Sequence, residues 1–110
     1  MKGLILSCLI LLNSAVFAHD YKCLDKVVFA PGVHESGEIH TYDGTRNELE
    51  SVHKDWIFKR DYNHLDSEST IEVAVINPQG KIVFHATSEM ESELKYQGKE
   101  KGVHIKCSKL

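Results

Sequence analysis

Apolar and polar residues alternate along much of the chain, and a period of two is typical of β-strands with one buried face. Near the C-terminus, for example, Val103 and Ile105 would face a core while His104 and Lys106 would face solvent. The strands that this pattern predicts are Tyr21–Phe29, Glu38–Tyr42, Thr70–Ile76, Lys81–Thr87 and Gly102–Cys107. Several short strands at such spacing favour an all-β fold, and specifically a small antiparallel β-sandwich.

The clearest predicted element is a β-hairpin over residues 70–87. Two runs rich in β-branched and aromatic residues flank the sequence Asn77-Pro78-Gln79-Gly80. A proline followed closely by a glycine between two such runs is a strong turn signal. We therefore expect Pro78 and Gly80 to form the turn of this hairpin.

The segment Thr45–Ser69 fits two different structures. Thr45-Arg46-Asn47-Glu48 has the form of a capping box, which favours the start of a helix. Val52, Trp56 and Phe58 equally fit one face of a strand. We expect a polar loop with one helical turn at most, followed by a strand from Val52 to Phe58.

Residues 1–18 have the three regions of a cleavable signal peptide. Lys2 supplies a positive charge, Leu4–Leu12 is mostly apolar, and Val16-Phe17-Ala18 places small residues before a cleavage site. The apolar run is shorter than the roughly 20 residues that span a bilayer. A buried N-terminal helix or strand is the alternative. We expect cleavage after Ala18, which leaves residues 19–110 as a single domain.

Cysteine usage agrees with export to an oxidising compartment. Cys8 would leave with the signal peptide, so Cys23 and Cys107 would remain as an even pair. We expect a disulfide between them, and two free thiols are the alternative. A cross-link that closes so long a loop would help a domain of this size, whose core is small.

The charge balance excludes some classes of partner. The chain has a formal net charge of −3 and no basic cluster in its sequence, which argues against nucleic acid and anionic lipid as partners. After the signal peptide no segment is apolar enough for a membrane span. We therefore expect protein partners, and no membrane span in this chain.

The seven histidines do not form a metal motif. No pair has the spacing of a helical zinc site, and His34-Glu35 is not followed by the rest of H-E-x-x-H, so we expect neither a metal nor another cofactor. His40, His85 and His104 alternate with apolar residues and should lie on solvated faces. The ordinary pKa of histidine is about 6.5, and the pH falls along the secretory pathway. One hypothesis is therefore that these side chains sense this change in pH.

Catalysis finds no support in the sequence. There is no G-x-S-x-G motif, and Cys23 and Cys107 fit a disulfide better than a nucleophile, so we expect no enzyme activity. The acidic stretch Glu89–Glu93 lacks the glycine and the ordered oxygen spacing of a calcium loop, and a solvated turn is expected there.

A series of motifs in the C-terminal part of the chain resembles a known family. The alternating strand, Pro-x-Gly turn and second apolar strand of Ile71–Phe84 are followed by Leu94-Lys95-Tyr96. Gly102–Cys107 then stands for a Gly-x-aromatic-x-x-Cys ending, with His104 in place of the aromatic residue. Near the front, Cys23 precedes Gly37-Glu38-Ile39. This series is similar to the GOLD (Golgi dynamics) domain of the TMED cargo receptors.

The resemblance implies a GOLD-like sandwich of the jelly-roll type. It further implies a disulfide between Cys23 and Cys107 and a hairpin turn at Pro78 and Gly80. It also implies a lumenal binding module that pairs with related GOLD-domain subunits and selects secretory cargo between endoplasmic reticulum and Golgi. The family's coiled coil, membrane span and tail have no counterpart before Leu110. If Leu110 is the natural end, secretion is expected, and the alternative function is a freestanding extracellular β-sandwich ligand or binding protein.

Overall fold

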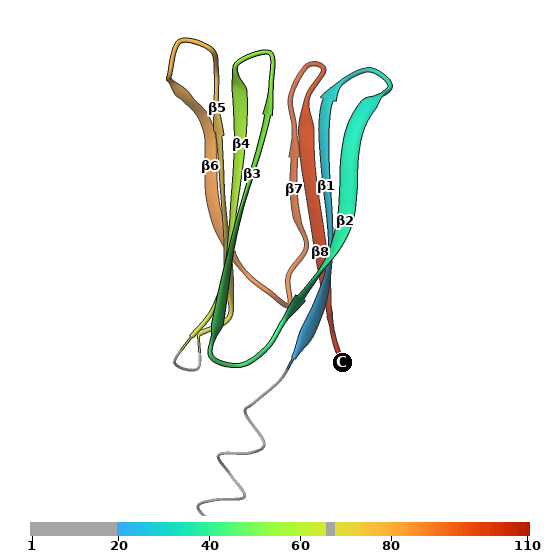
Figure 1. Ribbon diagram of the computed structural model, residues 1–110, viewed down its shortest axis with the longest axis vertical. Coiled ribbons are helices and arrows are strands. Elements are labelled where there is room, and N and C mark those ends of the chain that lie inside the picture. Colours follow the sequence, from blue (N-terminus) through green and yellow to red (C-terminus); the bar gives the residue numbers. More distant parts are fainter. Residues whose placement is uncertain (1–19, 66–67) are drawn as a thin grey trace, which may run out of the picture.

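The computed structural model describes residues 20–65 and 68–110, which form two antiparallel β-sheets packed as a sandwich (Figure 1). The eight strands are β1 (Tyr21–Ala30), β2 (Val33–Thr41), β3 (Thr45–His53), β4 (Trp56–His64), β5 (Thr70–Ile76), β6 (Ile82–Glu89), β7 (Leu94–Gln97) and β8 (Gly102–Lys109). The all-β sandwich that the alternating pattern predicts is therefore confirmed. The predicted signal peptide, residues 1–18, lies outside the described ranges.

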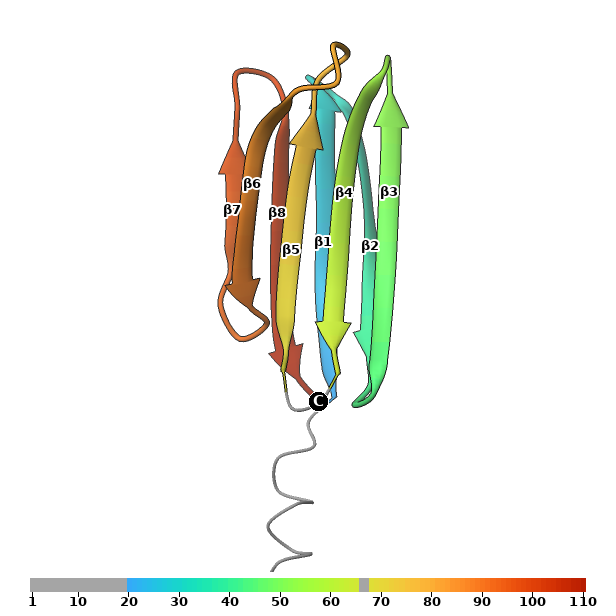
Figure 2. The same cartoon turned by 90° about the vertical axis from the view of Figure 1, so that its left-hand side faces the viewer.

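Strands that follow one another in the chain lie side by side within each sheet. The first sheet has the order β2-β1-β8-β7 and the second has the order β3-β4-β5-β6 (Figures 1 and 2). The chain passes between the sheets from β2 to β3 and again from β6 to β7, and β8 closes the first sheet by pairing with β1. This is an up-and-down order, whereas a jelly roll consists of two Greek keys, so the jelly-roll detail of the expectation is corrected here.

The core lies between the two sheets and is formed by alternate residues of nearly every strand. Phe29 of β1 and Phe58 of β4 meet edge to face across it, with ring centroids 5.4 Å apart. The buried apolar side chains are Tyr21, Cys23, Val27, Phe29, Phe58, Tyr62, Ile71, Val73, Val75, Met90, Leu94, Val103 and Ile105. Each large apolar side chain removed from water in this way contributes about 1.5–3 kcal/mol to folding, so this layer supplies the main driving force.

The prediction for residues 45–69 is wrong, because this segment begins with a β-hairpin made of β3 and β4. The hairpin turns at Lys54 and Asp55, which both have positive φ angles of 49° and 66°. Two central residues with positive φ define the tight turn that matches the twist of paired strands. The Thr45 hydroxyl caps no helix; it donates to the carbonyl of Tyr42 at 2.6 Å and so stabilises the turn between β2 and β3.

The turn between β5 and β6 contains Pro78 and Gly80, as the sequence predicts. The Asn77 side chain organises it, since its Oδ1 accepts hydrogen bonds from the backbone N–H of Gln79 at 3.1 Å and of Lys81 at 2.9 Å. Gly80 has a φ of 80°, a conformation that favours glycine.

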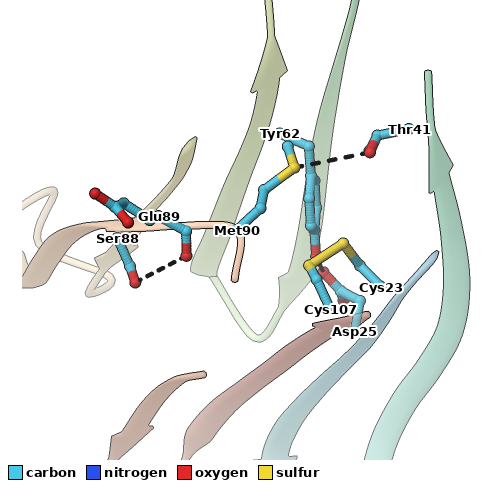
Figure 3. Close-up of a disulfide and its surroundings, with 8 residues drawn as sticks. All are labelled: Cys23, Asp25, Thr41, Tyr62, Ser88, Glu89, Met90 and Cys107. Atoms are coloured by element: carbon cyan, nitrogen blue, oxygen red, sulfur yellow. Dashed lines mark hydrogen bonds between the residues drawn. A yellow bond between two sulfur atoms is a disulfide. The ribbon is translucent and has the colours of Figure 1, made fainter. Parts of the chain in front are cut away.

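The acidic stretch after β6 is only partly the solvated turn that was expected. Glu91, Ser92 and Glu93 are exposed, but Met90 is fully buried. Its Sδ accepts a hydrogen bond from the Thr41 hydroxyl of β2 at 3.7 Å (Figure 3). Met90 therefore closes the core at the end where the chain passes from β6 to β7.

Candidate functional site

The Cys23–Cys107 disulfide is present, which confirms the sequence prediction. The two cysteines face each other directly in the register of β1 and β8, and the bond closes a loop with a sequence separation of 84 residues. It lies near the start of β1, whereas Pro78 and Gly80 lie at the opposite end of the sandwich, where β5 turns into β6 (Figure 1). The predicted site residues are therefore structural and are not brought together.

A buried ion pair next to the disulfide joins the two sheets. Asp25 lies two residues after Cys23 on the same face of β1, and it faces Arg60 of β4 (Figure 3 shows Asp25 beside the disulfide). Arg60 donates through Nε and Nη2 to the two carboxylate oxygens of Asp25, both at 3.1 Å. The exposed fractions are only 5% for Asp25 and 4% for Arg60. Buried charges need such pairing, because removing them from water is costly.

Neighbouring polar groups form further hydrogen bonds with Asp25 and Arg60. The Tyr62 hydroxyl donates a short hydrogen bond to Oδ2 of Asp25, while Nη1 of Arg60 donates to Ser51 Oγ at 3.0 Å and to the carbonyl of Phe58 at 2.7 Å. In the described ranges every buried side-chain nitrogen and oxygen has a partner. The Asp25 carboxylate accepts hydrogen bonds from three fixed donors. This arrangement favours a structural role, linking the two sheets, over a role in binding a ligand.

Sequence reasoning missed this pair, although a signal was present. Asp25 occupies an inward position of an alternating strand, between Cys23 and Val27, and Arg60 occupies an inward position of β4. A charged residue at a core position of the pattern predicts a buried partner of opposite charge.

Tyr62 gives a test of the network by pH titration. Burial, together with the negative charge of Asp25, raises the pKa of Tyr62 far above its ordinary value of 10. Because the folded pKa exceeds the unfolded one, this contribution to stability is complete below about pH 10 and is lost as the pH rises above it. In the folded protein Tyr62 should therefore stay protonated. We expect the absorbance titration of tyrosinate to be the same in Tyr62→Phe as in the unaltered protein, up to the pH at which the protein unfolds. Loss of a native ionisation step near pH 10 in that variant would contradict the buried geometry.

Lysines gather on the outer face of the first sheet, so the expectation of no basic cluster is wrong for the folded chain. We call this surface the basic face. It carries Lys22 and Lys26 from β1, Lys95 from β7, Lys106 from β8, and three histidines, His34, His40 and His104. Its carboxylates are matched to histidines: Glu38 lies 3.8 Å from His40, and Glu93 pairs closely with His104. The absence of nucleic acid and anionic lipid among the partners stays a prediction.

The outer face of the second sheet is acidic and carries an apolar row. Its charged residues are Arg46, Glu48, Glu50, Lys59, Asp61, Glu72 and Glu89. Val52, Ile57, Ile76 and Ile82 lie opposite one another on the four successive strands, and we call them the apolar row. Val52 is 59% exposed and Ile82 is 57% exposed, at the two edges of the sheet.

The histidines that were expected on solvated faces are found there. His40 and His85 are exposed and His104 is partly exposed. The hydrogen bond from His104 holds the pKa of the Glu93 carboxyl below its usual range, and His85 Nε2 lies 2.6 Å from a carboxylate oxygen of Glu72. Whether these histidines sense pH stays a prediction. Among residues 20–65 and 68–110, no three His, Cys, Asp or Glu side chains form a cluster able to hold a metal ion.

Comparisons with known proteins assign no family. No protein-family model matches the sequence, and no curated protein and no solved structure is significantly similar to it. The similarity to the GOLD domain therefore rests on the sequence motifs alone. In the part of the chain that the structure describes, no helix is long and apolar enough to cross a membrane.

Proposed function

We propose that this domain is a protein-binding module of the early secretory pathway, which pairs with related GOLD-domain subunits and takes part in cargo selection between endoplasmic reticulum and Golgi. The apolar row is the observation that carries the proposal. A line of β-branched side chains on the solvent face of a sheet, bordered by charged residues, is typical of a protein–protein contact. The GOLD-like motifs and the predicted signal peptide support a lumenal sandwich subunit as the partner that covers this row.

The arrangement of the row fits a contact of this kind. Its four members are on adjacent strands in direct register, so they form one continuous strip across the sheet. On one side the strip adjoins Glu50, Lys59 and His85, which would form the polar rim. On the other side of the strip are the turn between β3 and β4 and the turn between β5 and β6.

The proposal is tested by a charge placed within the row. We expect Ile82→Lys to weaken pairing with co-expressed GOLD-domain cargo receptors by about tenfold or more, because an ammonium group would be desolvated in the contact. Co-precipitation of the full chain and its distribution between endoplasmic reticulum and Golgi fractions and the medium are measured. Thr87→Lys is the matched control, since Thr87 is also exposed on the outer face of β6.

Two outcomes would overturn the proposal. If Thr87→Lys weakens pairing as much as Ile82→Lys, the row is not the contact. If the unaltered chain accumulates in the medium without GOLD-domain partners, the freestanding secreted binding protein is the correct alternative. Formation of the Cys23–Cys107 disulfide in each variant shows that it has folded.

A further inference from the structure

A groove crosses the basic face along β1 and β8. Two neighbouring depressions, of about 360 Å³ and about 400 Å³, share Lys26 and His104 and so form one continuous hollow. Gly102 forms part of its floor, between Val28 of β1 and Gln97 of β7. A Cβ at Gly102 would lie 2.9 Å from the carbonyl oxygen of Tyr96, so a glycine here allows β8 and β7 to approach closely.

The lining of the groove is strongly basic. Five lysines line it: Lys26, Lys95, Lys99, Lys101 and Lys106. The acidic residues of the lining are Asp25, Glu38 and Glu100. Asp25 is already paired with Arg60, and the nearby Glu93 is paired with His104. In the described ranges none of the five ammonium groups forms a salt bridge with a carboxylate. Lys101 instead lies over the ring of Trp56, 4.6 Å from its centroid.

The five lysines come from separate parts of the chain. Lys26 is on β1, Lys95 on β7, Lys106 on β8, and the other two lie in the turn between β7 and β8. Such a concentration of unpaired positive charge in a hollow raises the local potential and attracts anions.

We propose that this groove binds a sulfated polysaccharide. The floor of the groove runs over the interior strands β1 and β8, whose backbone groups are used in pairing with each other and with β2 and β7. The edge strands β2 and β7 line its sides, and their free backbone groups lie in the plane of the sheet rather than in the hollow. An extended peptide gains its affinity mainly from free backbone groups at a sheet edge, and this floor offers none. It offers ammonium groups, spaced along a hollow that is open to solvent. A flexible chain with a sulfate on each sugar matches that pattern, because every contact is one of charge.

The proposal goes beyond protein pairing and is independent of it, because the basic face and the apolar row are on opposite sheets. It is tested on the purified mature protein with heparin as the probe. We expect Lys26→Gln/Lys95→Gln to weaken heparin binding by about tenfold or more. The slope of log affinity against log salt concentration should fall by about two, because each lost ion contact removes about one released counterion.

Lys59→Gln/Lys81→Gln is the matched control, since it removes the same charge from exposed positions on the second sheet and its hairpin turn. It should leave both the affinity and the salt slope nearly unchanged. Equal weakening by the two double variants would mean a general attraction by net charge and would overturn the proposal. Circular dichroism and the absence of free thiols show that each variant is folded.

Two further probes decide the class of ligand. Chemically desulfated heparin should bind at least about tenfold more weakly than heparin, since the contacts would be lost with the sulfates. If it binds equally well, the assignment to sulfate is wrong. If polyglutamate of similar charge binds as tightly as heparin, the groove is a site for acidic peptides and the polysaccharide proposal fails.

Discussion

Replacement of Asp25 by alanine is expected to lower the free energy of unfolding by about 3–5 kcal/mol, because it leaves the Arg60 guanidinium buried without its partner. Both side chains are almost completely removed from solvent, so water cannot replace the lost carboxylate. The loss is measured by equilibrium unfolding of the purified protein in urea, as a lower midpoint of the transition.

The chain contains a matched control on its surface. Arg46 donates to the two carboxylate oxygens of Asp61 at 3.1 and 2.8 Å, which is the same fork geometry as that of Arg60 on Asp25. Arg46 is half exposed, however, and exposed pairs contribute about 0–1 kcal/mol. Asp61→Ala should therefore have a small effect. A loss for Asp25→Ala that is no larger than that for Asp61→Ala would contradict the role of burial.

A third variant separates the cost of an unpaired charge from the value of the pair itself. When a buried pair is replaced by apolar residues of similar volume, stability is often unchanged or improved. Asp25→Leu/Arg60→Met combined with Tyr62→Phe removes the charges and the phenol that donates to them. We expect this triple variant to be more stable than Asp25→Ala. If it is less stable, the network contributes through its hydrogen bonds rather than only avoiding a penalty.

The alternation of apolar and polar residues predicted the strands whose inward residues are apolar. In β5, for example, Ile71, Val73 and Val75 are all buried and leave a clear period of two. β3 has the same period, but its inward positions include Asn47 and Ser51, and Ser51 is needed there to bind Arg60. Polar side chains on both faces make the pattern resemble a loop. The segment was therefore misread because of the same buried network that sequence reasoning did not foresee.

The turn between β3 and β4 was missed for a related reason. Tight hairpin turns with two positive φ angles usually carry Asn-Gly or Asp-Gly. Here the positions are occupied by Lys54 and Asp55, and a lysine rarely adopts positive φ. Without a glycine the sequence offers no turn signal, and the strand prediction continued through this point from Val52 to Phe58.

The basic face could not be predicted because it depends on strand order. Its lysines are separated by as many as 84 positions, from Lys22 to Lys106, and none of them has another basic residue next to it in the sequence. They meet only because β8 pairs with β1, and the same pairing brings Cys107 to Cys23. The two cysteines were predictable as a pair from their number and setting, whereas a lysine has no such obligatory partner.

That pairing of β1 with β8 is the basis of the second large effect. Removal of the cross-link by Cys23→Ala/Cys107→Ala should lower the free energy of unfolding by about 4–5 kcal/mol, since a loop of 84 residues is no longer closed in the unfolded chain. Urea unfolding measures this loss. The unfolded chain should also expand, so the dependence of stability on urea should become steeper.

The steeper dependence distinguishes loss of the cross-link from loss of packing. Val27→Ala/Val103→Ala is the matched control, because these two residues also face each other in the β1–β8 register and are also buried. It removes buried volume and lowers the midpoint, but it leaves the disulfide closed and the unfolded chain as compact as before. If the cysteine variant shows an unchanged urea dependence and a loss below about 1 kcal/mol, hydrogen bonds and packing alone hold β8 against β1, and the disulfide adds little.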